Sequence, residues 1–243
     1  MTTRDPPQAR REPRPSEQLR RDGYTLVPRV LDTAACLALA AAMPAAPPRA
    51  GGLRDPLRNI GAHNSPALRA LDALAASLLG TPTHAVRAIL FDKTAASNWA
   101  VAWHQDLAIP VLERHEVAGY RNWSRKQGVW HVLPPQAVLD GMLTLRLHLD
   151  DCDAHNAPLQ VLPGSHVLGR LDAERTAELV GGGGAVTCSA RAGDVLAMRP
   201  GLLHASAKAL RPRRRRILHV EYAAHDLPAP LRWQRAWDEV VSP

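Results

Sequence analysis

The amino-acid sequence predicts a mainly β protein with two helices near its start. Apolar residues recur at helical spacing in two stretches before residue 80, whereas short apolar runs bounded by Gly, Pro, Asp and Asn follow from residue 84 onward. No helical pattern is recognised between these later runs. Many short strands without intervening helices favour a closed or double-sheet β architecture over alternating βαβ units.

The elements before residue 84 have recognisable ends. A short strand is expected at residues 23–28. Asp32 is placed to cap a helix that Pro44 stops. Ser65, which precedes a proline, is placed to cap a second helix, which carries leucines at helical spacing and ends at Gly80.

The later part of the chain divides into expected strands and two other segments. The strands are expected at residues 85–91, 143–149, 159–162, 185–188, 194–198, 202–206 and 215–222. Residues 107–135 have no strong period and are expected to form an irregular lid over a substrate. Residues 231–240 are expected to form a helix with Trp233 and Trp237 on one face.

Length and charge define the broad class of protein. The chain has 243 residues, of which 46% are hydrophobic, which suits one domain with a sizeable core, placed at residues 23–243. Residues 1–22 are rich in Arg and Pro and are expected to be a flexible arm. The net charge of +7 comes largely from this arm and from residues 211–216. Because no aromatic residues interleave with these basic runs, no nucleic-acid partner is expected.

Cysteine usage indicates a reduced, cytoplasmic setting. The three cysteines (Cys36, Cys152 and Cys188) are few, far apart and odd in number, which argues against a disulfide framework. No signal-peptide pattern and no apolar run near 20 residues are recognised, so no membrane partner is expected. The expected partner is a small molecule, and the oligomeric state is left open between a monomer and a homodimer.

The stretch from Trp103 to Asp106 carries a candidate for chemistry. Because side chains alternate along an extended segment, His104 and Asp106 point to the same face. Such a pair offers an imidazole nitrogen and a carboxylate oxygen to one metal ion. One more His would complete the 2-His-1-carboxylate facial triad of non-haem Fe(II) oxygenases. His204 is the candidate, although the chain has eleven histidines and spacing alone leaves the third ligand open.

A basic strand after His204 favours this interpretation. A dicarboxylate cosubstrate such as 2-oxoglutarate binds iron through its 2-oxo acid end and needs a fixed partner for its far carboxylate. The planar guanidinium of an arginine suits that role, and arginines begin the expected strand at residues 215–222.

Several segments together resemble the phytanoyl-CoA dioxygenase (PhyH) family of Fe(II)/2-oxoglutarate oxygenases over roughly residues 85–223. The segments that carry the resemblance are residues 87–93, 103–107, 159–166, 193–195, 203–206 and 215–222. Each is weak alone, and their order and spacing make the match specific. The resemblance implies a double-stranded β-helix (a jelly roll, cupin-like) with N-terminal helices that buttress it.

The resemblance also implies roles for individual residues. His104, Asp106 and His204 correspond to the iron ligands, which would also be the catalytic residues. Residues that correspond to the cosubstrate-binding positions are Arg215, Ser206, Arg146, Ile89 and Lys93. The Arg run leaves Arg214 and Arg216 as alternatives to Arg215. One departure is Ala157, which stands where the family has a turn glycine after Asn.

The implied activity is Fe(II)- and 2-oxoglutarate-dependent hydroxylation of an unactivated C–H bond of a small molecule, which consumes O2 and releases succinate and CO2. Desaturation, cyclisation or epimerisation at the same iron, and a non-catalytic cupin-like binding module, stay open as alternatives. The retained Asp106 disfavours the halogenating relatives, in which halide replaces the carboxylate. Candidate substrate contacts are the aromatic and basic residues of the expected lid: Trp123, Arg125, Lys126, Trp130 and His131. Together with Arg146, these cations favour an anionic substrate.

Overall fold

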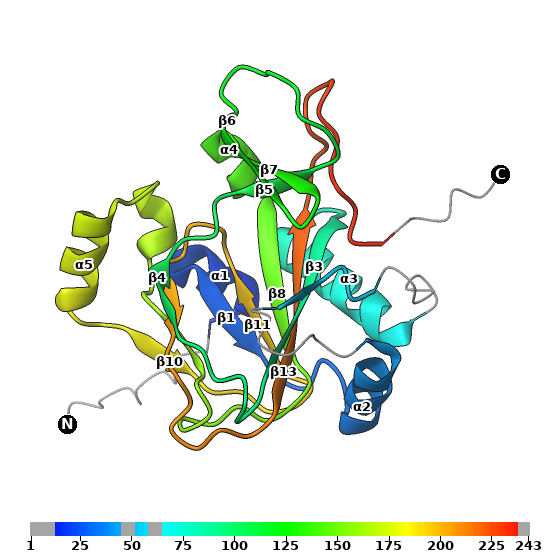
Figure 1. Ribbon diagram of the computed structural model, residues 1–243, viewed down its shortest axis with the longest axis vertical. Coiled ribbons are helices and arrows are strands. Elements are labelled where there is room, and N and C mark those ends of the chain that lie inside the picture. The colour runs from blue at the N-terminus through cyan, green and yellow to red at the C-terminus, as the bar shows by residue number, and fades with distance from the viewer. Residues whose placement is uncertain (1–12, 45–51, 58–64, 238–243) are drawn as a thin grey trace, which may run out of the picture.

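The computed structural model describes residues 13–44, 52–57 and 65–237 (Figure 1). All of the paired strands in this part of the chain are antiparallel, and they form three sheets. The six-stranded sheet runs β1-β11-β8-β13-β3-β2, the four-stranded sheet β10-β9-β12-β4, and the three-stranded sheet β5-β7-β6. The six-stranded sheet comprises β1 (Tyr24–Val27), β2 (Leu53–Arg54), β3 (His84–Lys93), β8 (Met142–His148), β11 (Val195–Met198) and β13 (Arg215–Ala223).

The four-stranded sheet contains the shorter strands β4 (Val101–His104), β9 (Leu159–Val161), β10 (Val186–Cys188) and β12 (His204–Ser206). Successive strands along the chain fall in different sheets, as β3 and β4, β8 and β9, and β12 and β13 do. This alternation is the topology of a double-stranded β-helix, or jelly roll. The mainly β fold class predicted from the sequence is therefore confirmed.

Helices cover the outer face of the six-stranded sheet. They are α1 (Pro15–Asp22), α2 (Thr33–Ala42) and α3 (Pro66–Leu79). As predicted, the Asp32 side chain caps α2 by accepting from Ala35 N at 2.7 Å, and α3 ends at Gly80 in the left-handed conformation. Within the described residues, no helix is long and apolar enough to span a membrane.

Strand β8 shows how the sequence separates the core from the interior of the barrel. Its leucines at 143, 145 and 147 belong to the cluster that packs against α3, and all three are fully buried. The residues that alternate with them, including Arg146 and His148, point to the opposite face because side chains alternate across a strand. Tyr222 on β13 ties the same face to α3 by donating its hydroxyl to Asp72 at 3.0 Å.

Four expectations about local structure are wrong. The expected irregular lid at residues 107–135 is mostly a sheet of β5 (Ile109–Val111), β6 (Arg121–Lys126) and β7 (Val129–Leu133). Strands β6 and β7 form a hairpin whose two-residue turn, Gln127 and Gly128, has positive φ at both positions. The turn was not recognised because β6 is largely exposed and has no apolar alternation.

Two helices also lie between strands where none were expected: α4 (Gln136–Asp140) and α5 (Ala173–Gly181). Part of the expected arm is ordered, because Pro15–Asp22 is helical and Leu19 on α1 is only 1% exposed. Because Leu19 is a single buried apolar residue among charged ones, the sequence there shows no helical periodicity. Residues 1–12 lie outside the described residues, and the single domain at 23–243 stays a prediction.

The expected C-terminal helix is not present within residues 231–237, and residues 238–240 lie outside the described part. Trp233 is buried in the cluster under the three-stranded sheet, where its indole donates to His225 O at 2.9 Å. Trp237 packs instead against the main core cluster. The two tryptophans therefore serve different packing sites in an extended segment.

The packing of β8 against the helices makes a measurable prediction. Leu145→Ala should lower the free energy of unfolding by about 2–5 kcal/mol, because it leaves a cavity in a fully buried site. Leu37→Ala, at a position that is 56% exposed, should change it by less than about 0.5 kcal/mol. Urea unfolding at 25 °C measures both, and equal effects would contradict this account of the core.

Candidate metal centre and adjoining cavity

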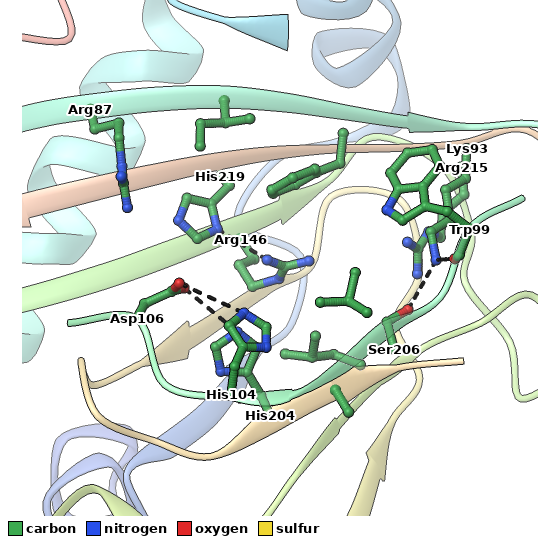
Figure 2. A pocket seen from close by; sticks show the side chains of 15 residues that line it. Arg87, Lys93, Trp99, His104, Asp106, Arg146, His204, Ser206, Arg215 and His219 are labelled. Carbon is green, nitrogen blue, oxygen red and sulfur yellow. Dashed lines mark hydrogen bonds and ion pairs between the residues drawn. The ribbon is translucent and has the colours of Figure 1, made fainter. Parts of the chain in front are cut away.

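Strand pairing brings the three candidate metal ligands together. His104 ends β4 and His204 begins β12, and the two are directly opposite each other in the antiparallel ladder. Their ring centroids are 4.2 Å apart. Asp106 follows β4 by two residues, and its carboxylate lies 3.8 Å from His104 Nε2 and 3.5 Å from His204 Nε2 (Figure 2). One ligand atom from each residue lies within 4.8 Å of the others.

Backbone carbonyls orient both imidazoles. Nδ1 of His104 lies 2.8 Å from Ala102 O, and Nδ1 of His204 lies 2.9 Å from Leu202 O. A carbonyl only accepts, so each Nδ1 carries the hydrogen and each Nε2 lone pair stays free for a metal. Both Nε2 atoms face Asp106. The tautomers are therefore the ones that a metal site needs.

The electrostatics favour the protonation states that bind metal. Burial alone would raise the pKa of Asp106, but His204, His219 and Arg87 together hold it below the ordinary range of a carboxyl group. Burial lowers the pKa of His204 to about 4, against the opposing effect of Asp106. At neutral pH the site thus offers an anionic carboxylate and a neutral buried imidazole, the forms that coordinate metal ions. Two imidazole nitrogens and one carboxylate oxygen fit Fe(II).

A cavity of about 170 Å³ extends from this triad into the barrel. The five residues predicted for cosubstrate binding all line it: Arg215, Ser206, Arg146, Ile89 and Lys93. Figure 2 shows the triad at one end of the cavity and Ser206, Lys93 and Arg215 at the other. The structure therefore brings together every residue that the resemblance assigned to the metal and to the cosubstrate.

The three consecutive arginines at the start of β13 have different surroundings. Arg215 is 3% exposed and points into the cavity. Arg214 pairs with Asp92 at 2.9 Å, and Arg216 makes a bidentate pair with Asp150 at 2.7 and 2.8 Å. Both neighbours therefore have carboxylate partners outside the cavity, which leaves Arg215 as the arginine that faces a ligand there.

Arg215 and its surroundings form an anion-binding end. The guanidinium donates to the carbonyl of Ala157, which has the positive φ of 55° expected at this turn. The Ser206 hydroxyl donates to the same carbonyl at 3.1 Å. Lys93 donates to Ser206 Oγ at 3.2 Å and to Trp99 O at 2.6 Å. Burial, together with Arg215 and Arg146, lowers the pKa of Lys93 to about 8.

Three of the cations in the cavity lack a carboxylate partner in the part of the chain that the structure describes. Within the described residues, Lys93, Arg146 and Arg215 form no ion pair with a carboxylate. Nε of Arg146 and Nε of Arg215 are buried without a hydrogen-bond partner in that part of the chain. Buried donors without partners are costly, and an anionic ligand would satisfy them. A dicarboxylate such as 2-oxoglutarate therefore fits this donor set.

A buried polar chain on β3, β8 and β13 holds Arg146. Its Nη1 donates to His219 Nδ1 at 3.0 Å, so His219 must carry its hydrogen on Nε2. That Nε2 lies 3.2 Å from Glu221, which accepts a further bond from Arg87. Burial raises and Arg87 lowers the pKa of Glu221, with a net fall. The carboxylate that balances Arg87 thereby also fixes His219 and, through it, Arg146.

A model of the phytanoyl-CoA dioxygenase (PhyH) family matches residues 19–217, most of the chain. The protein belongs to the PhyH family. A curated relative, the L-proline trans-4-hydroxylase of Streptomyces griseoviridis, is 27% identical in an alignment 181 positions long that covers 64% of this chain. The match spans 60% of the length of that relative.

Solved structures of other enzymes share the fold. The carbocyclase SnoK from nogalamycin biosynthesis aligns with a TM-score of 0.61 and 18% identity, over 93% of this chain and 87% of that chain. The epimerase SnoN, solved with Fe3+, alpha ketoglutarate and nogalamycin RO, aligns with a TM-score of 0.62 and 21% identity, over 93% and 95%. At these identities the likeness establishes the jelly-roll fold.

The predicted substrate residues of this PhyH chain lie away from the cavity. Trp123, Arg125 and Lys126 are on β6, and Trp130 and His131 are on β7. None of the five lines the cavity beside the triad. The two tryptophans pack edge to face at 6.3 Å, and His131 is 1% exposed. Trp123, Trp130 and His131 therefore pack within the three-stranded sheet, whereas Arg125 and Lys126 are exposed on β6.

Gln105 is a positioning residue that the sequence did not single out. Its amide donates to Gly169 O at 2.8 Å and to Gly201 O at 2.7 Å, and it accepts from Leu171 N at 2.9 Å. It thus joins the segment before α5 to the turn before His204. Its only sequence signal is its place between two candidate ligands, where strand alternation turns its side chain to the opposite face. Phe91, Trp99 and His219, which also line the cavity, had no recognisable signal beyond strand alternation.

The series of buried hydrogen bonds that ends at Arg146 predicts that two variants of His219 differ in their affinity for 2-oxoglutarate. His219→Leu removes the acceptor for Arg146 and should weaken 2-oxoglutarate binding about tenfold or more, since a buried unsatisfied donor costs about 1–3 kcal/mol. His219→Gln retains an acceptor for Arg146 and a donor for Glu221, so it should retain most of the affinity. Calorimetric titration measures both, and equal losses would contradict a positioning role.

Lys93 predicts a pH dependence of anion binding. A bound dicarboxylate favours charged Lys93, so affinity is greatest below its free-state pKa of about 8 and falls as pH rises through that value. The fall should approach about tenfold per pH unit above this point. In Lys93→Arg, which stays charged, 2-oxoglutarate affinity should be nearly constant from about pH 7 to 9. A flat profile in the wild-type protein would exclude this role.

Proposed function

We propose that this PhyH-family protein is an Fe(II)- and 2-oxoglutarate-dependent oxygenase that hydroxylates an unactivated C–H bond of a small molecule, with release of succinate and CO2. The observation that carries the proposal is the triad of His104, Asp106 and His204 at one end of a cavity in which Lys93, Arg146 and Arg215 have no carboxylate partner among the described residues. Family membership supports the same reaction.

Each part of the site contributes in a specific way. The triad would hold iron through one face, and the metal would supply the open positions at which cosubstrate and dioxygen bind. Arg215 and Ser206 would bind the far carboxylate of 2-oxoglutarate, and Arg146 lies along the cavity between them and the triad. The buried walls around His204 and Arg215 exclude water, which strengthens these charge interactions.

Other outcomes at the same site are desaturation, cyclisation and epimerisation. Structural relatives named as a carbocyclase and an epimerase support keeping them as alternatives, because the placement of the substrate decides the outcome. A halogenase is disfavoured, because Asp106 occupies the place that a halide would need. A non-catalytic binding module is disfavoured, because such a module needs neither the triad nor the unpaired cations.

The proposed partners follow from the same features. A small molecule is the proposed substrate, and the curated relative that acts on L-proline supports this class. We propose a cytoplasmic enzyme without a nucleic-acid or membrane partner, as a monomer or homodimer. The three free, buried cysteines support a reducing compartment.

Anaerobic titration with Fe(II) and 2-oxoglutarate tests the function. The wild-type protein should develop a visible metal-to-ligand charge-transfer band, and succinate should form when air and a substrate are added. His204→Ala should lose the band, because a facial triad with two ligands no longer holds the metal. Arg215→Gln should retain iron but weaken 2-oxoglutarate binding by about tenfold or more, since hydrogen bonds to charged groups contribute about 1.5–3 kcal/mol.

Arg214→Gln is the matched control, because Arg214 is exposed and pairs with Asp92 outside the cavity. Its 2-oxoglutarate affinity should equal that of the wild type. The absence of a band in the wild-type protein would refute the iron and 2-oxoglutarate assignment. Equal effects of Arg214→Gln and Arg215→Gln would refute the anchor.

A further inference from the structure

A second hollow, here called the α5 groove, lies beside the metal centre. It is open to solvent, has a volume of about 670 Å³, and is lined by β4, the residues after it, and α5. Figure 1 shows α5 standing beside β4 at one side of the molecule. His104 lines both the α5 groove and the cosubstrate cavity. The two hollows therefore share one lining residue, which is a candidate metal ligand.

The wall that α5 contributes is one continuous face. Ala173, Thr176, Ala177 and Val180 line the groove, at the i, i+3, i+4 and i+7 spacing of one side of a helix. Unlike α3, α5 buries none of its residues in the protein. An amphipathic helix ordinarily covers a core with such a face. Here the face borders open space, and the small side chains leave room for a ligand.

The opposite wall is also largely apolar. Trp103, Leu107 and Leu133 line it, so the groove separates two apolar surfaces. Its size falls in the range of about 300–1,000 Å³ that is typical of sites for drug-sized ligands. A free amino acid such as proline would leave most of this surface uncovered. The walls fit a larger apolar body, such as a ring system.

One cation gives the groove a polar end. Arg170 lines it just before α5 and is exposed. Within the described part of the chain, its side chain forms no hydrogen bond or ion pair. The other charged group in the lining, Asp172, already caps α5 by accepting from Arg175 N at 2.8 Å. Asp172 therefore does not occupy Arg170, and an anionic group on a ligand can pair with the Arg170 guanidinium.

We infer that the α5 groove binds the substrate, and that the substrate is an apolar, ring-sized molecule with one anionic group, its ring between α5 and Trp103 and its anion at Arg170. This inference rests on the proposed function for the chemistry that follows binding. It replaces the predicted contacts on β6 and β7 with residues on α5 and β4.

Ligand binding tests the groove without any turnover. The probe is 8-anilinonaphthalene-1-sulfonate, an apolar ring system with one anion whose fluorescence rises on binding. Wild-type protein should bind it saturably, at one site. Ala177→Trp should weaken binding about tenfold or more, because the new indole fills the groove. Arg175→Trp, on the opposite side of α5, should bind like the wild type, and equal binding by all three proteins would overturn the proposal.

Matched competitors test the charge. 2-Naphthoate should displace the probe about fivefold better than 2-naphthamide, the difference expected of an exposed ion pair. In Arg170→Gln this preference should vanish while 2-naphthamide affinity stays unchanged. A preference for the anion that persists in Arg170→Gln would overturn the assignment of Arg170. Far-UV circular dichroism verifies that each variant is folded.

A measurement of how close the bound ligand lies to the metal tests this inference separately from the proposed function. With Mn(II) added, the proton resonances of bound 2-naphthoate should broaden, and with Zn(II) they should not. The broadening should disappear in Ala177→Trp. If Mn(II) binds and the resonances stay sharp, the groove assignment fails and the metal site stands. If Mn(II) does not bind while the fluorescence results hold, the proposed function fails and the groove stands.

Discussion

The pairing of β4 with β12 is the interaction on which the site depends. Because His104 and His204 are opposite each other in one antiparallel ladder, backbone hydrogen bonds set the distance between two metal ligands. Asp106 then needs only two further residues of chain to reach both rings. A ligand set built on a strand pair is more precisely placed than one built on loops. The jelly roll supplies this pair near the mouth of the barrel.

The interior of the barrel depends on alternation in the central strands. On β13, Arg215, His219 and Glu221 face inward, while Leu218, Val220 and Tyr222 pack under the helices. The same sequence pattern that encodes the core therefore also encodes the lining of the cavity. These buried charged side chains are tolerated because each either has a partner in the protein, as Arg87 has, or has donors that a bound anion would satisfy.

These periodic strands explain why the sequence predicted a mainly β fold, whereas the jelly-roll topology and the full set of metal and cosubstrate positions came from the family resemblance. The eight expected strands are present within a few residues of their predicted ends, since turn residues and alternation mark them directly. Three features gave no such signal. The β6–β7 hairpin is exposed, α1 has one apolar anchor, and α5 buries nothing in the protein. The candidate substrate residues stay a prediction: they do not line the cavity, and Trp123 and Arg125 on β6 both contact Trp130 on β7. Composition alone does not distinguish such packing from ligand binding.

Strand β12 has a consequence for the size of the cosubstrate. It begins with a metal ligand, His204, and ends two residues later with Ser206 at the anion-binding end. Residues i and i+2 of a strand share a face and lie about 7 Å apart, a separation that the pleat fixes. The backbone itself therefore sets the chain length of the acid that can reach both ends. A diacid with one methylene more or fewer would misplace one terminus, whatever its charge.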